Sequence, residues 1–371
     1  MNIGADRSRK VAYVLPQMSI NLFGGAEVQA IALMNAVNNL RKGFIAKAFN
    51  MWEDKLDQFD IVHIFGPGAF PSESLAIARF ARDNKIAVVV SPIFYLNSKE
   101  LLTARRNVFA NLTWAWYLRV RNVISNIRLL RNLDIYHNVS QVLASASLVI
   151  PNTRDEFEFL SSFFHLEKSR CKVIPNGVDA KFRAGDPALF KASFGVDDFI
   201  LFVGRIEPRK NVLRLIGAFE RSGLNSHLVI LGQVADIEYY SKCKKEATNK
   251  VLFVPPMAHD SALLASAYKA SKVVALPSYH ETPGLAALEG GLAGANVVIT
   301  SVGGTRDYFR DYAWYVDPTS EDSICRALIS AFSAPKTNQL SDYLERSFGW
   351  SAIAENMVGC YQSVVSGDCR S

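Results

Sequence analysis

The chain has 371 residues, of which 49% are hydrophobic and 20% are charged, and its formal net charge is +6. This length predicts two domains, and the composition is that of a globular protein, which excludes a disordered or fibrous chain. Apolar runs stay below the ~18–20 residues of a membrane span, and no stretch of signal-peptide length follows the N-terminal MNIGADRSRK. The five cysteines show no paired spacing, so we expect a reduced, cytoplasmic protein.

Short runs rich in Val, Ile and Leu alternate with helical patterns along the chain, which is typical of parallel sheets in α/β proteins. The runs lie at residues 11–15, 61–65, 87–91, 147–151, 200–204, 227–232, 251–254, 273–277 and 296–300. A further expected strand, CKVIP, precedes the turn at Asn176-Gly177-Val178-Asp179, where we place a domain boundary. The sequence therefore predicts domains at 1–178 and 179–345 and a C-terminal helix, about 350–366, within residues 346–371.

Two glycine-containing turns lie in the first predicted domain. Gly24 and Gly25 follow the strand VAYVLP and open a helix, EVQAIALMNAV, and on their own they predict only a turn. The segment from Gly66 to Pro71, GPGAFP, lacks the third glycine of a dinucleotide-binding fingerprint, which argues against a dehydrogenase.

The excess of positive charge belongs to the N-terminal half. Residues 1–178 contain 21 Lys and Arg against 14 Asp and Glu, whereas residues 179–371 contain 20 against 21. The positive charge is densest in the segment of about 101–133, which has no acidic residue. Arginines and aromatic residues are interleaved there: Arg105, Arg106, Arg119, Arg121, Arg128 and Arg131 with Phe109, Trp114, Trp116 and Tyr117. This pattern fits either a surface that meets anionic lipid or a helical insertion with core aromatics and solvated arginines. Nucleic-acid binding is disfavoured because no recognised binding motif accompanies the basic residues.

Basic residues follow the strand ILFVG in the second predicted domain. Arg205 and Lys210 lie in the loop directly after this strand, where open α/β sheets bind their ligands. A guanidinium can grip phosphate through two hydrogen bonds, and an ammonium adds a point charge. The pair could therefore neutralise a leaving diphosphate without a metal, although a solvated basic turn would have the same composition.

The segment 275–304, ALPSYHETPGLAALEGGLAGANVVITSVGG, supplies complementary groups. We expect a helix that begins at Thr282 and Pro283, because Thr is a good N-cap and Pro suits the first helical position. The N–H groups of Thr282, Gly284 and Leu285 would then face a phosphate. Glu281 lies just before this helix, and Glu289 lies about two turns further along it. Because the helix is otherwise apolar and should be buried, an acidic residue at position 289 indicates a specific role.

Five segments carry a resemblance to a known family: IPNGVD (174–179), FVGRIEPRKN (202–211), LPSYHETPGLAALEGGLAG (276–294), VGGTRDYF (302–309) and YVDP (315–318). In order and spacing they resemble the retaining glycosyltransferases of family 4, among the group 1 glycosyl transferases. The resemblance implies the GT-B fold, in which two Rossmann-like, doubly wound parallel-sheet domains flank a cleft. It also implies transfer of a sugar from a nucleotide donor to an acceptor hydroxyl with retained configuration.

The resemblance also implies roles for the residues in these segments. In the family, the residue matching Glu289 holds the nucleotide ribose and the one matching Glu281 contacts the donor sugar. Those matching Arg205 and Lys210 hold the diphosphate, and the leaving phosphate can take the acceptor's proton. A glycine pair similar to Gly24 and Gly25 faces the donor phosphate and the acceptor across the cleft, and the tail of the chain crosses back to the first domain.

The chain departs from the family at the donor sugar. Many members have a histidine after the strand that corresponds to AVVVS, where this chain has Ser91-Pro92-Ile93-Phe94-Tyr95. His63 is the nearest alternative, and a core histidine explains it at least as well. Thr282-Pro283-Gly284 also replaces a usual Phe, so the sugar contacts differ from the family pattern while the nucleotide contacts are kept.

Other functions fit the sequence less well. A GT-B nucleotide-sugar epimerase would need acid and base groups around the sugar, and histidines are scarce. A metal-dependent transferase needs a carboxylate pair at a strand end, and the closest imitation, Asp236-Ile-Glu238, is typical of a loop entering a helix. A non-catalytic membrane-docking relative would not need the charged site residues, and this chain keeps them: Arg205, Lys210, Glu281 and Glu289.

The substrates are less well defined by the sequence. Residues that read the base are expected near Gly232-Gln233 and Pro255-Pro256-Met257. The likeness of HETPGLAALEGG and VGGTRDYF to bacterial mannosyltransferases of surface polysaccharide synthesis, including lipopolysaccharide, favours GDP-mannose as donor. The basic segment favours a lipid-linked saccharide acceptor and a peripheral position at the inner face of the membrane. No metal or other cofactor is expected.

Overall fold

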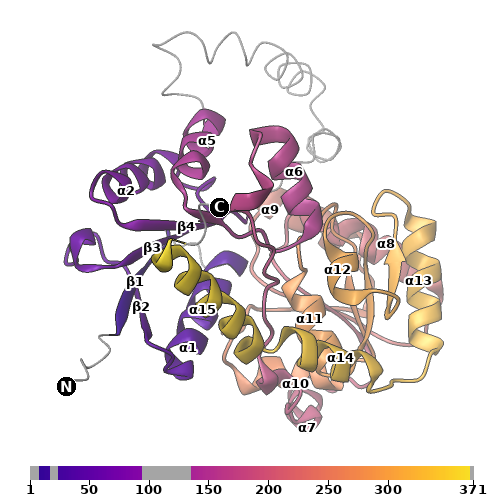
Figure 1. The fold of residues 1–371 in the computed structure, drawn as a ribbon. Helices are drawn as coiled ribbons and strands as arrows, with labels where there is room; N and C mark the ends of the chain where they lie inside the picture. Colours follow the sequence, from indigo (N-terminus) through magenta and orange to yellow (C-terminus); the bar gives the residue numbers. More distant parts are fainter. Residues whose placement is uncertain (1–7, 17–23, 94–134, 368–371) are drawn as a thin grey trace, which may run out of the picture. The chain divides into compact units, whose positions relative to one another are not determined.

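The computed structural model describes residues 8–16, 24–93 and 135–367, which form two compact units (Figure 1). The first unit contains the described residues up to Gly177 together with those from Trp350 onward, and the second runs from Val178 to Gly349. The basic segment of about 101–133 lies outside the described residues.

The first unit contains a parallel sheet of five strands in the order β2-β1-β3-β4-β5. Its strands are β1 (Arg9–Val14), β2 (Phe44–Ala48), β3 (Ile61–Phe65), β4 (Ala87–Ser91) and β5 (Leu148–Val149). Its helices are α1 (Gly25–Leu40), α2 (Pro71–Asp83), α5 (Ile135–Ser145), α6 (Arg154–Phe164) and α15 (Trp350–Ser366), with short 3-10 turns at Leu56–Gln58 and Lys168–Arg170.

Helix α15 belongs to the first unit although the whole second unit precedes it in the chain. It packs against α1 (Figure 1). Its residues Ile353, Met357 and Tyr361 belong to the same apolar cluster as Val11 and Leu33. Burial of large apolar side chains stabilises this contact by about 1.5–3 kcal/mol each. The first unit therefore needs the last helix to complete its core.

The second unit contains a parallel sheet of six strands in the order β8-β7-β6-β9-β10-β11, which is the 3-2-1-4-5-6 order of a Rossmann fold. Its strands are β6 (Ile200–Val203), β7 (Leu228–Leu231), β8 (Val251–Val254), β9 (Val273–Leu276), β10 (Asn296–Thr300) and β11 (Ala313–Val316). Its helices are α7 (Pro187–Phe194), α8 (Val212–Ser222), α9 (Ile237–Glu246), α10 (Ala262–Ala270), α11 (Leu285–Leu292), α12 (Thr305–Phe309), α13 (Glu321–Ser333) and α14 (Gln339–Phe348), with 3-10 turns η5 (Ala180–Phe182) and η6 (Pro208–Lys210). Two doubly wound parallel sheets confirm the GT-B fold.

The strand predictions were right for the inner strands and for the edge strands β5 and β8, but they missed two strands. Both missed strands, β2 and β11, are edge strands whose side chains are largely half-buried or exposed, so they lack a continuous apolar run. The expected strand CKVIP is reduced to one isolated bridge between Cys171 and Val149. Asp236 caps the start of α9, in agreement with a loop entering a helix.

The predicted beginning of the helix near Glu281 was also wrong. Helix α11 begins at Leu285, and its N-cap is Gly284 in the left-handed conformation (φ +74°) rather than Thr282. A Cβ on Gly284 would approach Ile299 Cδ1 to 3.0 Å and Leu276 Cδ2 to 3.3 Å. The left-handed turn and the contact with the sheet both favour glycine here, and the helix begins two residues later than predicted.

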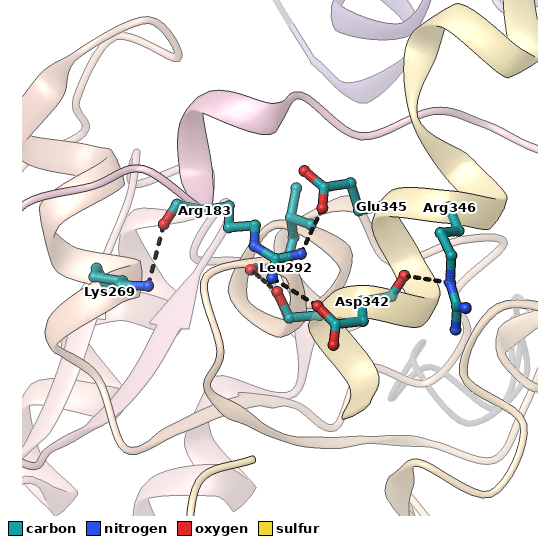
Figure 2. A network of polar contacts seen from close by, with 7 residues as sticks. Arg183, Lys269, Leu292, Asp342, Glu345 and Arg346 are labelled. Carbon is teal, nitrogen blue, oxygen red and sulfur yellow. Dashed lines mark hydrogen bonds and ion pairs between the residues drawn. The ribbon is translucent and has the colours of Figure 1, made fainter. Parts of the chain in front are cut away.

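The second unit begins at Val178 and ends at Gly349, and these two ends lie side by side. The Val178 amide donates to the Phe348 carbonyl at 2.8 Å, in an isolated bridge between Val178 and Gly349. Arg183, just after η5, pairs with Asp342 and Glu345 of α14, and Lys269 donates to its carbonyl (Figure 2). The first residues of the second unit are thus bound to α14, its last helix.

Candidate functional site

The candidate site lies at the carboxyl edge of the second sheet, where the strand order reverses between β6 and β9. Doubly wound sheets bind ligands at this switch point, because the loops after the two central strands leave in opposite directions. The loop after β6 contains Arg205 and Lys210, and the loop after β9 contains Glu281. The topology therefore brings together residues that are 71 positions apart in the chain.

Lys210 and Glu281 form a close ion pair at this point. Lys210 Nζ donates to Glu281 Oε1 at 2.5 Å, and the two side chains are only 15% and 8% exposed. Burial lowers the pKa of Lys210, although the Glu281 carboxylate opposes this. Burial acts to raise the pKa of Glu281, but Lys210 and Arg209 outweigh it and hold that pKa below its usual value. The pair is shielded from water, so its electrostatic interactions with an incoming anion are stronger than in bulk solvent.

Arg205 and Arg209 flank the buried pair. Arg205 Nη2 lies 3.4 Å and Arg209 Nη2 3.2 Å from Glu207 Oε1, and both guanidinium groups are about half exposed. Exposed ion pairs of this kind exchange easily with other anions, because they contribute little stability. Two guanidinium groups are therefore available at the rim of the site.

Asn211 and Arg214 tie three strand-end loops together, and neither was predicted from the sequence. Asn211, itself in a left-handed conformation, donates from Nδ2 to the carbonyls of Pro277 (2.9 Å) and Pro318 (2.8 Å). Arg214 donates to the Pro318 carbonyl and to the Tyr279 hydroxyl at 2.8 and 2.7 Å. These bonds fix the loops after β6, β9 and β11, so the backbones that carry Lys210 and Glu281 are held in place.

The turn before α11 presents backbone donors. In the part of the chain that the structure describes, no protein acceptor is recorded for the amides of Thr282, Gly284 and Leu285. Leu285 is the first helical residue, so its N–H belongs to the free end of the helix, which carries partial positive charge.

Glu289 is buried in α11, with 6% of its surface exposed, and both of its oxygens are bound. The Tyr268 hydroxyl donates to Oε2 at 2.6 Å, and His259 Nε2 lies 2.7 Å from Oε1. These bonds offset the cost of burying a carboxylate, which would otherwise be several kcal/mol. Neither Tyr268 nor His259 was predicted; the histidine between strand β8 and helix α10 was the available signal.

The residues expected to read the base follow neighbouring strands. Gly232 and Gln233 come directly after β7, and Pro255–Met257 come after β8, at the carboxyl edge that also carries Lys210.

Gly24 and Gly25 open α1 in the first unit. Gly24 is the N-cap and Gly25 the first helical residue, and the Gly24 amide donates to Glu27 Oε2 at 2.9 Å. The helix therefore begins where the sequence predicted. Contact of the glycine pair with a donor phosphate stays a prediction.

His63, the alternative to the missing histidine, lies in the core of the first unit. It is 0% exposed within β3, and its Nδ1 and Nε2 contact the Tyr361 hydroxyl (2.7 Å) and Ser91 Oγ (2.9 Å). Burial lowers the pKa of His63 to about 3. Among the residues described, His63 is thus a neutral core residue that links β3 to β4 and α15.

The described residues contain no group of three or more His, Cys, Asp or Glu side chains able to hold a metal ion. No helix among them is sufficiently long and apolar to cross a membrane.

The comparison with protein families confirms the resemblance in the second unit. Residues 190–346 match the family described as "Glycosyl transferases group 1". The match contains β6 to β11 and therefore every charged residue of the candidate site.

Curated relatives carry the name D-inositol 3-phosphate glycosyltransferase. One from Mycobacteroides abscessus is 29% identical over 253 residues, 61% of this chain and 54% of that protein. One from Rhodococcus erythropolis is 30% identical over 244 residues, 60% of this chain and 55% of that protein. The chain thus spans little more than half the length of these relatives.

Solved structures share the fold over nearly the whole chain. Sucrose-phosphate synthase from Thermosynechococcus elongatus has a TM-score of 0.71 at 15% identity, covering 97% of this chain and all of that one. The Anabaena protein HepE, solved in complex with UDP and glucose, has a TM-score of 0.70 at 16% identity, covering 96% of this chain and all of that one.

Proposed function

We propose that this protein transfers a hexosyl group from a nucleoside diphosphate sugar to a hydroxyl of a saccharide acceptor. The match of residues 190–346 to the group 1 glycosyl transferases supports this proposal. In this reaction the bond between the anomeric carbon and the diphosphate oxygen breaks. The acceptor oxygen bonds to the same carbon on the same face, so the configuration is retained. The acceptor's proton passes to the leaving diphosphate.

The observation that carries this proposal is the buried Lys210–Glu281 pair at the switch point. A diphosphate that enters the site takes Lys210 as its counter-ion, with Arg205 at the rim as a second cation. Glu281 is then released to accept hydrogen bonds from sugar hydroxyls. A cation held in a dry site stabilises the charge that develops on the leaving diphosphate without a metal ion.

Substrate positioning completes the proposed mechanism. The amides of Thr282, Gly284 and Leu285 face the diphosphate at the start of α11, and Glu289 accepts hydrogen bonds from the ribose. Gly24 and Gly25 meet the donor phosphate and the acceptor from the first unit. Correct placement of two reactants can contribute about 7–11 kcal/mol of the barrier reduction, so a site of this kind needs no covalent intermediate on Glu281.

For the donor, the segments HETPGLAALEGG and VGGTRDYF favour GDP-mannose. The complex of HepE with UDP and glucose supports a uridine nucleotide as the competing donor. The name of the curated relatives supports a phosphorylated cyclitol as a further type of acceptor.

We also propose a lipid-linked saccharide acceptor, in surface polysaccharide synthesis, at the cytoplasmic face of a membrane. It rests on the charge pattern of residues 101–133, and its test is co-sedimentation with vesicles that contain anionic lipid. The variant in which Arg105, Arg106, Arg119 and Arg121 become Gln should sediment less than the unchanged protein. Equal sedimentation of both would remove the membrane from the proposal.

Calorimetric titration of the protein with GDP, UDP, ADP and TDP, each with and without magnesium, tests the main proposal. We expect one nucleotide to bind independently of magnesium, and Glu289→Ala to weaken that binding about 10-fold or more, since hydrogen bonds to a charged acceptor contribute about 1.5–3 kcal/mol. If none of the four binds, the proposed function is wrong.

A further inference from the structure

Glu289 and three neighbouring side chains form a chain of polar contacts that the transfer reaction alone does not require. Lys181 Nζ lies 3.4 Å from His259 Nδ1, and His259 Nε2 lies 2.7 Å from Glu289 Oε1. The Tyr268 hydroxyl closes the chain on Glu289 Oε2 at 2.6 Å. The four residues come from η5, the loop after β8, α10 and α11, so the arrangement is built by the tertiary fold.

The partners of His259 determine which of its nitrogens carries the proton. The Lys181 ammonium has only donors, so the Nδ1 that faces it acts as an acceptor. Nε2 then carries the proton and donates it to Glu289. Lys181 is itself held by Asp179, 3.2 Å away, so the tautomer of His259 is fixed from the side opposite to Glu289.

Tyr268 is fixed as a donor for a different reason. Its ring is fully buried, and burial together with the negative charge of Glu289 raises its pKa well above the usual value. The hydroxyl therefore keeps its proton and directs it at Oε2. Phe182, also fully buried, packs edge-on against both rings, with centroid distances of 5.3 Å to His259 and 5.3 Å to Tyr268.

An ionised carboxylate offers about four lone-pair sites, two on each oxygen. In Glu289, His259 occupies one site on Oε1 and Tyr268 occupies one site on Oε2, so each oxygen can accept one further hydrogen bond. Two acceptor sites on neighbouring oxygens match two hydroxyls on neighbouring carbons. A buried site built for two hydroxyls rejects an analogue that lacks one of them, since the unmatched acceptor stays without a partner.

We propose that His259 and Tyr268 are positioning residues that orient Glu289 toward the vicinal hydroxyls of a ribose, and that they make the site selective for ribonucleotides over deoxyribonucleotides. This inference rests on the proposed function, in which the ligand is a nucleoside diphosphate. His259 and Tyr268 act through Glu289 and do not themselves need to contact the ligand.

The test is calorimetric titration of the full chain with GDP and UDP and with the 2′-deoxy and 3′-deoxy forms of each. For the nucleotide that binds, we expect the unchanged protein to prefer the ribose form at least ~10-fold over either deoxy form, which corresponds to one lost hydrogen bond of about 1.4 kcal/mol. In Tyr268→Phe and His259→Ala this ratio should fall toward 1, mainly through weaker binding of the ribose form.

Two further variants separate orientation from folding. His259→Gln keeps an N–H donor for Glu289 and should restore part of the ratio. His165→Asn, an exposed histidine of the first unit with φ +54°, should leave the ratio unchanged. A loss of folding would weaken both forms of the nucleotide equally, so the ratio is the readout that a merely structural role would not move.

The outcomes distinguish this inference from the function beneath it. If the unchanged protein binds ribose and deoxyribose forms equally, or if Tyr268→Phe and His259→Ala keep the ratio of the unchanged protein, the inference is wrong while the diphosphate site stands. If neither GDP nor UDP binds in any form, the proposed function fails and this inference fails with it.

Discussion

The two units share an architecture but place very different residues at the ends of their central strands. In the second unit the strand ends carry charged groups, of which Lys210 and Glu281 are paired and buried. In the first unit the polar groups on the central strands are neutral. Inside the core, the Tyr361 hydroxyl hydrogen-bonds to both the Tyr13 hydroxyl (2.8 Å) and His63 Nδ1 (2.7 Å).

This difference shows what a doubly wound sheet does and does not provide. The topology supplies an edge where loops converge, but the side chains decide whether that edge attracts an anion or anchors a helix. In the first unit Tyr13 and His63 bond to Tyr361 of α15, whereas in the second unit Lys210 and Glu281 form a charged pair at the edge of the sheet. The predictions below test that division, beginning with the largest expected effect.

Replacing Lys210 with Ala should destabilise the protein most. The change leaves Glu281 as a buried charge without its main partner, which costs about 3–5 kcal/mol in comparable pairs. Urea unfolding gives the loss of stability, and nucleotide titration of the same protein should show no binding.

A double variant provides the control for this prediction. Lys210→Met combined with Glu281→Gln removes both charges and should recover much of the stability but none of the nucleotide binding, because neutral pairs of similar volume replace buried ion pairs at little cost. A single variant as stable as the double one would show that the pair is well hydrated and the contrast between the units is smaller than we infer.

Replacing Tyr361 with Phe should weaken the first unit alone. The change leaves His63 Nδ1 and the Tyr13 hydroxyl without their shared partner, and an unsatisfied buried group costs about 1–3 kcal/mol. Nucleotide affinity should not change. Tyr312→Phe, at an exposed ring of the second unit, is the matched control and should have no effect on stability.

Acid should destabilise the first unit through His63. The pKa of His63 is about 3 in the folded chain and 6.5 in an ordinary environment, so between these values the unfolded chain binds a proton that the folded chain does not. Stability is therefore full above pH 6.5 and falls as the pH is lowered. At pH 5 the loss from this group is about 2 kcal/mol.

Urea unfolding at pH 7 and pH 5 checks this contribution. His63→Gln should lose about 2 kcal/mol less than the unchanged protein over the same interval, since glutamine does not titrate. In the second unit, burial lowers the pKa of His280 to about 4, so His280→Gln is the parallel variant there. Equal acid sensitivity of His63→Gln and the unchanged protein would mean that His63 can be protonated in place.

The smallest effect is expected for Arg183. Its pairs with Asp342 and Glu345 lie at the surface, with the guanidinium 32% exposed, and surface ion pairs contribute less than about 1 kcal/mol (Figure 2). Arg183→Ala should therefore shift the urea midpoint slightly, and 1 M salt should reduce the difference between the two proteins. A loss as large as that of Lys210→Ala would make this surface network comparable with the buried pair.

Much of the fold could be predicted because its central strands are buried on both faces. Runs such as ILFVG and VVAL have no polar position, so their pattern alone marks a parallel strand. The edge strands β2 and β11 lack this signal, whereas the edge strand β8, VLFV, has it. Strand β2 reads Phe-Ile-Ala-Lys-Ala, and only Phe44 and Ala46 are buried. The start of α11 was misplaced because local capping preferences favoured Thr282, whereas packing against Ile299 and Leu276 required a left-handed Gly284.

Some residues of the candidate site could likewise be predicted from the sequence and others could not. Charged residues in the loops after apolar strands, such as Lys210 and Glu281, could be found because a parallel sheet brings its strand ends to one edge. His259 was visible as a histidine between an expected strand and a helix, but its role was missed because it depends on contacts with Lys181, 78 positions away, and with Glu289. Asn211 donates to two backbone carbonyl oxygens, which every residue has, so no sequence pattern marks it. Arg214 bonds to Asn211 Oδ1, the Tyr279 hydroxyl and the Pro318 carbonyl, and this set of partners exists only in the folded chain.

The return of α15 to the first unit sets the order in which the chain can fold during synthesis. Domains near the N-terminus usually fold first as a chain emerges from the ribosome. Here the apolar face of α1 has to wait for Ile353, Met357 and Tyr361, which are made after the whole of the second unit. The second unit can therefore complete its core while the first still exposes part of its own, and a nascent chain halted at Gly349 should attract chaperones to the N-terminal half.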